Sequence, residues 1–302
     1  MSASPDLPFV AAPPGALDTV TAAAEGAATH WGFEEPHLIR MGMNGIFAAG
    51  DNVLLRVGRP TAPPHLAIRL AEVLTHAGLL VPTYVREDPY VSHHHAVFAV
   101  RAVNESGPID WVAVGEMISV LHRIDPHEFM FGYPVPFCGD FPWWNFQSLM
   151  DDVGADLDPP ARTAIADAIG RCMPLLDRER GSTSVICHGD VHPGNVMQSV
   201  DGPVLLDWDL LCHGPAAWDH APLLTWSQRW GGEPGIYESF AEGCGMSMRD
   251  DPLAEALAEL RLVAATLMRV RATRENPAAA EEAELRLRYW RGDSDAPQWH
   301  PQ

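Results

Sequence analysis

The chain has 302 residues, of which 47% are hydrophobic, and its formal net charge at pH 7 is −20. This length allows one large domain or two lobes, and no apolar run approaches the roughly 20 residues of a membrane span. Such acidity disfavours nucleic acid and anionic membranes as partners. It favours a cationic small molecule, or it is a general solubility feature of the protein.

The expected compartment is the reducing cytoplasm. The five cysteines are odd in number and form no CxxC pair, so neither a disulfide framework nor a zinc ribbon is indicated. Residues 1–15 are predicted to form a loose leader. They carry no basic residue before their first apolar stretch, which argues against a signal peptide.

The first third of the chain is predicted to be rich in strands. Apolar spacing indicates helices at 16–31 and 65–77, and strands at 37–41, 52–57, 81–86, 90–93 and 96–103. The stretch 42–51, which contains Asn44 and Gly45, is predicted to be a glycine-rich turn between two strands. Such a turn can place backbone N–H groups over phosphates, although an ordinary hairpin loop is the alternative.

Arg56 is a single charge inside an apolar strand, and it requires a partner or an open face. It is interpreted either as an edge-strand arginine in solvent or as a cation that binds phosphate. Glu72 lies beside the apolar stripe of helix 65–77 and is expected to reach back to Arg56.

The remainder is predicted to be mostly helical after a polar linker at 104–110. Helices are expected at 111–124, 161–176, 251–276 and 278–289. The irregular segment 126–150 contains Trp143 and Trp144, which are expected to lie in the core or to form a stacking wall of a pocket. This pattern predicts an α+β plan with two lobes, an N-lobe at 1–104 and a C-lobe at 105–302.

The stretch 185–209 carries most of the polar chemistry. A short strand at 185–187 leads into a loop with His188, Asp190, His192 and Asn195. Two further strands, 195–200 and 204–207, are joined by Asp201-Gly202-Pro203, a strong hairpin signal. The hairpin is expected to return Asp207 to the loop.

The residue types at these positions suit phosphoryl transfer. Asn195 and Asp207 supply hard oxygen ligands of the kind that Mg²⁺ prefers. Asp190 is then free to orient a hydroxyl and accept its proton, as in the catalytic loops of kinases. An alternative is a metal hydrolase, with His188-x-Asp190-x-His192 as the metal-binding triplet, but no further histidine follows with suitable spacing.

The sequence His188-Gly189-Asp190-Val191-His192-Pro193-Gly194-Asn195 resembles the catalytic loop of the aminoglycoside phosphotransferase and choline kinase-like family. Leu206-Asp207-Trp208-Asp209 resembles the magnesium-binding segment of that family, and Gly214-Pro215 with Trp218-Asp219-His220-Ala221 resembles the segment that follows it. Leu121-His122 is similar to the end of the family's Leu-His helix. The resemblance spans roughly residues 38–225.

The resemblance implies a two-lobed protein-kinase-like fold, with a β-rich N-lobe and a helical C-lobe that holds the catalytic hairpin. It implies that Asp190 is the catalytic base and that Asn195 and Asp207 are ligands of Mg²⁺. His188 and Asp219 would shape the loop. Arg56 stands in place of the usual strand lysine, with Glu72 as its helix partner, and His220 replaces a leucine. The nucleotide site would comprise Arg56, Glu72, Asn44 and Gly45.

The expected activity is Mg²⁺-dependent transfer of the γ-phosphate of ATP or GTP to a hydroxyl of a small molecule. An antibiotic is one candidate acceptor, as for a resistance or self-resistance kinase. A metabolic kinase for an amino sugar, choline or homoserine and an inactive nucleotide-binding module are the alternatives. Candidate acceptor-binding residues are Asp209, Trp143, Trp144 and Glu233. Asp140, Asp151, Asp152 and Glu238 are further acidic candidates for recognising amines, or they are solvated surface residues.

Overall fold

The computed structural model describes residues 13–129, 131–182 and 184–300, so most of the expected leader, residues 1–12, lies outside the described residues. Contacts divide the chain into two compact units. Unit 1 holds the described residues up to Asp110, with Ile124–Val135 and Pro193–Leu210. Unit 2 holds Trp111–Arg123, Pro136–His192 and the described residues from Leu211 onward. The expected division at residues 104 and 105 stays a prediction.

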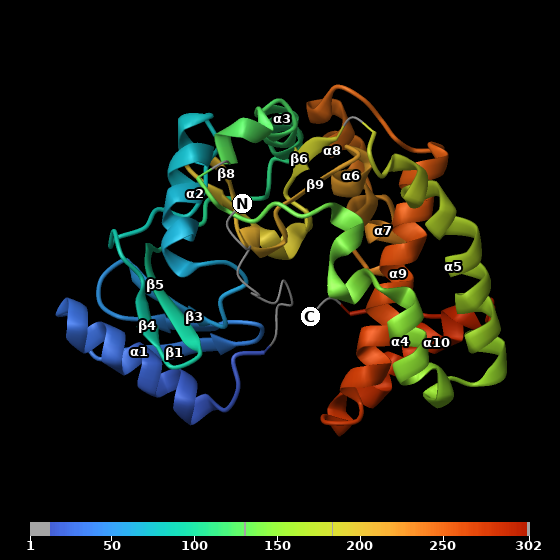
Figure 1. Cartoon of the computed structure of the whole chain (residues 1–302), viewed down its shortest axis with the longest axis horizontal. Helices are drawn as coiled ribbons and strands as arrows, with labels where there is room; N and C mark the ends of the chain where they lie inside the picture. Colours follow the sequence, from blue (N-terminus) through green and yellow to red (C-terminus); the bar gives the residue numbers. More distant parts are fainter. Residues whose placement is uncertain (1–12, 130, 183, 301–302) are drawn as a thin grey trace. The chain divides into compact units, whose positions relative to one another are not determined.

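Unit 1 is built on a five-stranded antiparallel sheet with the order β1-β2-β3-β5-β4 (Figure 1). Its elements are α1 (Leu17–Trp31), β1 (His37–Met41), β2 (Gly45–Ala48), β3 (Val53–Gly58), α2 (Pro64–His76), β4 (Tyr90–Ser92), β5 (His95–Arg101), β7 (Val196–Ser199) and β8 (Gly202–Leu205), with short 3₁₀ turns at Pro126–Phe129, Pro193–Asn195 and Trp208–Leu210. The expected strand at 81–86 is wrong, because Tyr84 forms only an isolated bridge with Val100.

Helix α1 covers one face of this sheet, and the hydrophobic core of unit 1 lies between the helix and the sheet. Its alanine-rich face, with Val20, Ala24 and Ala27, packs on apolar strand residues that include Leu55 and Val57. Successive strand residues point to opposite faces. Arg56, between Leu55 and Val57, therefore lies on the face of the sheet away from α1.

The hairpin β7–β8 belongs to unit 1 and differs from the expected hairpin in its turn. Ser199 pairs with Gly202, so the two turn residues are Val200 and Asp201, and Pro203 lies inside β8 opposite Gln198. The carbonyl of Gln198 accepts the N–H of Ser106 and so points away from β8. Pro203 is tolerated because an antiparallel ladder needs no hydrogen bond at this pair.

Unit 2 is mainly helical. Its elements are α3 (Trp111–Leu121), α4 (Phe146–Val153), α5 (Pro159–Glu179), β6 (Val185–Cys187), β9 (Cys212–Gly214), α6 (Ala217–Leu224), α7 (Trp226–Arg229), α8 (Ile236–Cys244), α9 (Pro252–Ala272) and α10 (Ala280–Trp290), with short 3₁₀ turns at Cys138–Asp140, Pro142–Trp144, Gly154–Asp156 and Pro277–Ala279. The helices expected near 111–124, 161–176, 251–276 and 278–289 are thus confirmed, with ends shifted by a few residues.

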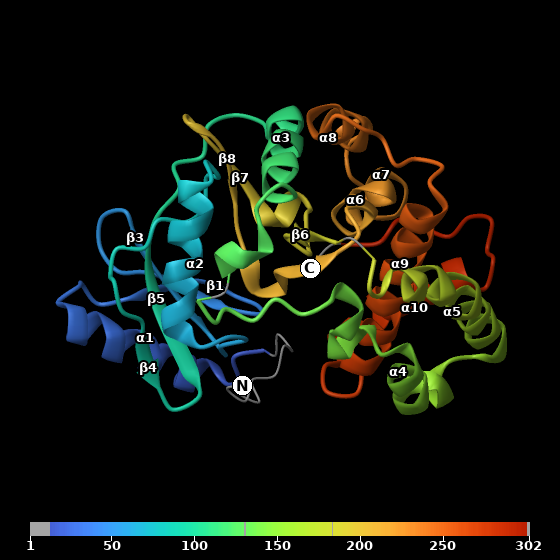
Figure 2. The same cartoon turned by 45° about the horizontal axis from the view of Figure 1, so that its top comes forward.

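Helix α9 is the central helix of unit 2. It packs against α5, α6, α10 and α4, and α5 runs beside it in both views (Figures 1 and 2). The N-terminus of α9 is capped by Asp251, whose side chain accepts the N–H groups of Leu253 and Ala254. Among the described residues, no helix is both long enough and apolar enough to span a bilayer.

Candidate active site

The loop that follows β6 is held by one buried carboxylate from α6. Asp219 accepts the N–H of His188 on Oδ2 at 3.0 Å and the N–H of Gly189 on Oδ1 at 2.8 Å. His188 is fully buried, and its Nδ1 accepts the N–H of Asp190 at 3.2 Å. These are the contacts that a loop-structuring role for His188 and Asp219 requires.

His122, at the end of α3, completes this network. Its Nε2 lies 3.0 Å from Asp219 Oδ2. Burial by itself lowers the pKa of His122, but the bond to Asp219 more than offsets this and raises the pKa to about 10. Burial raises the pKa of Asp219, and the bond from His122 reverses that, so its pKa is lowered. The two side chains therefore form a buried ion pair at neutral pH.

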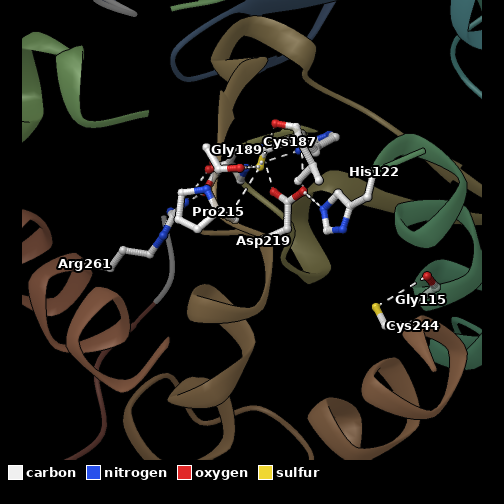
Figure 3. A network of polar contacts seen from close by, with 12 residues as sticks. Gly115, His122, Cys187, Gly189, Pro215, Asp219, Cys244 and Arg261 are labelled. Carbon is white, nitrogen blue, oxygen red and sulfur yellow. Dashed lines mark hydrogen bonds and ion pairs between the residues drawn. The ribbon is translucent and has the colours of Figure 1, made fainter. Parts of the chain in front are cut away.

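His122, Asp219 and the buried Cys187 bring their ligand atoms within 4.8 Å of one another. They form the single such cluster found among the described residues. The triplet His188-x-Asp190-x-His192, on which the alternative of a metal hydrolase rests, does not form such a cluster. Asp219 is already occupied by two backbone N–H groups and by His122, and burial holds the pKa of the Cys187 thiol well above its usual range. Hydrogen bonding therefore satisfies this cluster without a metal (Figure 3).

Asp190 has two nitrogen-bearing partners within unit 2. Its Oδ1 lies 3.3 Å from a terminal guanidinium nitrogen of Arg261 on α9, and its Oδ2 lies 3.4 Å from Nε2 of His192. Burial raises the pKa of Asp190, but His192, then Arg261 and His188, lower it by more, so the net shift is downward. The carboxylate is consequently ionised at neutral pH, as a proton acceptor must be.

The candidate metal ligands lie in unit 1 and are joined by the backbone. The N–H of Leu206 donates to the carbonyl of Asn195 at 2.8 Å, which brings Asp207 next to Asn195, as the hairpin predicted. Asn195 is buried, and Asp207 has a φ of 55°, a left-handed conformation that few residues other than glycine adopt. Asn and Asp are the residues that best tolerate it.

Arg56 joins both carboxylates of the Asp-Trp-Asp segment. One of its terminal nitrogens lies 3.2 Å from Oδ1 of Asp207 and 2.6 Å from Oδ2 of Asp209. Burial lowers the pKa of Arg56, whereas Asp209 and Asp207 raise it by more, so the arginine stays charged. Two carboxylates thus converge on one cationic group, and the hydrogen bond from Leu206 keeps Asn195 next to Asp207 along the chain. Such a set of hard oxygen donors fits Mg²⁺.

Comparison with known proteins shows the family of the chain. The model of the APH phosphotransferase enzyme family matches residues 49–260. The chain belongs to this family. Its members transfer phosphoryl groups, and this APH chain is a phosphotransferase of the kinase type with an alcohol group as acceptor.

Solved structures confirm the two-lobed α+β kinase-like fold of the APH chain. An aminoglycoside 2'-phosphotransferase in complex with GDP has a TM-score of 0.68 at 15% identity, over 88% of this chain and 96% of that one. A choline/ethanolamine kinase family protein from Mesorhizobium loti has a TM-score of 0.64 at 17% identity, over 92% and 95%. A macrolide 2'-phosphotransferase from Brachybacterium faecium has a TM-score of 0.56 at 18% identity, over 88% and 97%. A comparison with curated protein sequences finds no match.

The expected nucleotide-binding residues are arranged differently from the prediction. Glu72 pairs with Arg69 one turn earlier on α2, at 2.8 Å, and both side chains are exposed. Arg56 is engaged by Asp207 and Asp209, so the expected Arg56–Glu72 pair is not formed. The stretch 42–51 is not one loop either, because Gly45 begins strand β2 and only residues 42–44 form the turn.

Asn44 lies in that turn, and its side-chain oxygen occupies the space next to Gly58. A Cβ on Gly58 would overlap this oxygen. A side chain at position 58 would therefore displace the side chain of Asn44. The contact of Asn44 and Gly45 with a nucleotide stays a prediction.

The acceptor candidates separate by burial. Trp144 is 1% exposed and packs against Trp218, with ring centroids 4.6 Å apart, so it belongs to the core and this burial does not fit an acceptor contact. Trp143 is half-buried and stacks on Phe141, and Glu233 is exposed. Asp209 is held by Arg56.

Most of the other acidic candidates are paired within unit 2. Asp140 binds Arg180, Asp152 binds Arg271 and Arg274, and Glu238 binds Arg249. Asp151 accepts a bond from Gln147. Three of these side chains thus make surface ion pairs, and their recognition of amines stays a prediction.

Sequence reasoning missed Arg261 altogether. It follows the buried Leu260 and precedes the buried Leu262 and Val263 in α9. A charge inside an apolar helical run was the available signal, of the same kind that singled out Arg56 in its strand.

Proposed function

We propose that this APH chain transfers the γ-phosphoryl group of ATP or GTP to a hydroxyl of a small molecule, with antibiotics as the first candidate acceptors. The observation that carries the proposal is the state of Asp190, an ionised carboxylate held by Arg261 and His192 on a loop pinned by Asp219. Such a group can orient a hydroxyl and take its proton.

The reaction follows from these roles. The acceptor hydroxyl donates its hydrogen bond to Asp190, and its oxygen forms a bond to the γ-phosphorus. The bond from the γ-phosphorus to the bridging oxygen breaks, the nucleoside diphosphate leaves, and the proton passes to Asp190. Asn195 and Asp207 would hold Mg²⁺, which neutralises charge on the phosphate oxygens when it is bound. Arg56 would contact phosphate oxygens as a planar fork.

The relatives support the choice of substrates. One aminoglycoside 2'-phosphotransferase was solved with GDP and kanamycin, and a spectinomycin phosphotransferase was solved with ADP and spectinomycin. Those ligands belong to those proteins, and experiment decides between an antibiotic and a metabolic acceptor for this chain.

The test is Mg²⁺-dependent release of ADP or GDP over a panel of hydroxyl-bearing molecules. The panel comprises aminoglycosides, spectinomycin, macrolides, peptide and nucleoside antibiotics, amino sugars, choline and homoserine. We expect acceptor-dependent release with at least one of them, abolished by EDTA. Nucleotide binding without turnover across the panel would favour the inactive binding module.

Asp190→Asn tests the base directly. The amide keeps the shape of the side chain but cannot take the proton, so kcat with the active acceptor should fall about 10²- to 10⁴-fold while KM for the nucleotide stays nearly unchanged. Asp201→Asn, at the exposed turn of the β7–β8 hairpin, is the matched control and should keep full activity. Full turnover by Asp190→Asn would remove the base assignment.

A further inference from the structure

We propose that Arg261 is a positioning residue that holds Gly189 and Asp190 of the catalytic loop in their working conformation. The inference rests on the proposed function, because it gives Arg261 a role through the candidate base. Figure 3 shows Arg261 reaching from α9 toward Gly189, while His122 approaches Asp219 from the other side.

The first argument is the location of Arg261. It lies on the central helix of unit 2, its side chain is 13% exposed, and its guanidinium carbon lies 4.9 Å above the ring of the fully buried Trp218. Its Nε is buried without a hydrogen-bond partner. Withdrawing a guanidinium from water is costly, and leaving one N–H unpaired adds to that cost. Stability alone does not account for such an arginine.

The second argument is the choice of partners. The guanidinium donates one hydrogen bond to Oδ1 of Asp190 at 3.3 Å and another to the carbonyl oxygen of Gly189. Both acceptors belong to the catalytic loop. A planar arginine fork that binds a side chain and the neighbouring backbone carbonyl fixes the orientation of both groups.

The third argument is the backbone of Gly189. Its φ is 93°, in the region that L-residues rarely adopt, and glycine there loses much conformational freedom on folding. Asp219 binds its N–H at 2.8 Å and Arg261 binds its carbonyl oxygen, so the residue is anchored from both α6 and α9. His192 also contacts Asp190, and its ring stacks on that of Trp226 in α7 with the ring centroids 5.3 Å apart, but it does not hold the carbonyl oxygen of Gly189 as Arg261 does.

These contacts predict a specific kinetic signature. Without Arg261 the carboxylate of Asp190 gains rotational freedom, and small misplacements of a reacting group cost on the order of 10²-fold in rate. Nucleotide binding involves other residues, so KM for the nucleotide should change little. Lysine supplies the charge as a point and cannot span both acceptors, so Arg261→Lys should recover only part of the rate lost in Arg261→Gln.

Arg269 provides a matched control on the same helix. It is partly buried, its Nε is also buried without a partner, and no contact between it and the loop is observed among the described residues. Arg269→Gln therefore removes a comparable charge from α9 without touching Gly189 or Asp190. It should keep the activity of the parent enzyme.

The experiment compares Arg261→Gln, Arg261→Lys and Arg269→Gln by steady-state kinetics with the acceptor found above, and by hydrogen exchange of the amides of residues 188–190. We expect Arg261→Gln to lower kcat about 10²-fold and to speed exchange in the loop while exchange along α9 is unchanged. We also expect no further loss when Arg261→Gln is added to Asp190→Asn, because the arginine acts through the carboxylate.

The proposal would be overturned if Arg261→Gln kept the parental kcat, or if Arg269→Gln lowered kcat by as much as Arg261→Gln does. It would also be overturned if the double variant Arg261→Gln, Asp190→Asn lost kcat by the full product of the two single losses. Unchanged loop exchange in Arg261→Gln would also overturn it. If the parent enzyme turns over no acceptor, the proposed function fails, and the exchange data still decide whether Arg261 holds the loop.

Discussion

At the scale of single residues, the buried pair of His122 and Asp219 determines how the catalytic loop is supported. Both charges are shielded from water, and Asp219 in addition accepts the two N–H groups of His188 and Gly189. An ion pair of this kind contributes little relative to an apolar pair of the same size, but removing one partner leaves a buried charge uncompensated. We therefore expect its protonation state to affect stability.

The pH dependence of stability follows from the shift of His122. Its pKa is raised from 6.5 to about 10 by Asp219, so its contribution is complete below pH 6.5 and is lost as the pH rises toward about 10. The lowered pKa of Asp219 acts at acidic pH, where its contribution is lost as the pH falls below 3.8. The Tm should therefore decline from pH 6.5 to about 10.

Thermal unfolding of the parent protein and of His122→Gln across this range provides the check. Glutamine can donate a hydrogen bond to Asp219 but does not titrate, so the decline in Tm should be shallower in the variant. Parallel Tm curves for the two proteins would show that other groups cause the decline.

At the scale of elements, two glycines set the packing of α3 against α8. A Cβ on Gly115 would overlap the carbonyl oxygen of Phe240, and a Cβ on Gly243 would overlap the carbonyl oxygen of Val112. Backbone atoms cannot move aside as flexible side chains do, so the helices approach closely only because both positions lack a side chain. Helix α3 ends next to His122, so this contact also supports the loop network.

Alanine at either glycine should separate α3 from α8. We expect Gly115→Ala and Gly243→Ala each to lower the free energy of unfolding by about 1–3 kcal/mol, the usual cost of overpacking. Gly170→Ala in α5 is the control, because no atom lies within 4 Å of its added Cβ and alanine favours the helix. Urea titrations should therefore show a lower free energy of unfolding for Gly115→Ala and Gly243→Ala and a higher one for Gly170→Ala. A Gly115→Ala protein as stable as the parent would contradict the close contact.

At the scale of the whole molecule, the net charge of −20 implies electrostatic self-repulsion in the folded state. Exposed ion pairs such as Arg274–Asp152 act in the opposite direction, but each such pair contributes little. Added salt should therefore weaken the repulsion between like charges by more than it weakens the attraction within the ion pairs. We expect the Tm to rise when the ionic strength increases from about 0.01 M to about 0.15 M, where the Debye length falls from about 30 Å to about 8 Å.

Differential scanning fluorimetry in NaCl, repeated in a second monovalent salt, measures this effect. A Tm that falls as salt is added would mean that the ion pairs outweigh the net repulsion. Equal responses to both salts would separate screening from specific ion binding.

The central motif could be interpreted from sequence because its geometry is local. Asn195 and Asp207 are joined by one short hairpin, and period-two apolar runs with a turn signal are enough to bring them together. The turn lies about two residues earlier than the sequence predicted, because Pro203 belongs to strand β8 and not to the turn. The Asp-Gly signal does not reveal that Pro203 occupies a strand position that needs no ladder hydrogen bond. The most specific part of the family resemblance lies in the same local stretch.

Residue type and spacing alone determined that this chain carries a candidate base and two oxygen ligands on a loop and hairpin, and they indicated a strand-rich first part and a helical remainder. Tertiary structure alone decided which partners the charges select. Arg56 meets Asp207 and Asp209, over 150 residues away, and not Glu72 on the next helix, while Arg261 meets Asp190 across 71 residues. Periodicity gives the face on which a charge lies, but the packing of distant elements determines which opposite charge that face meets.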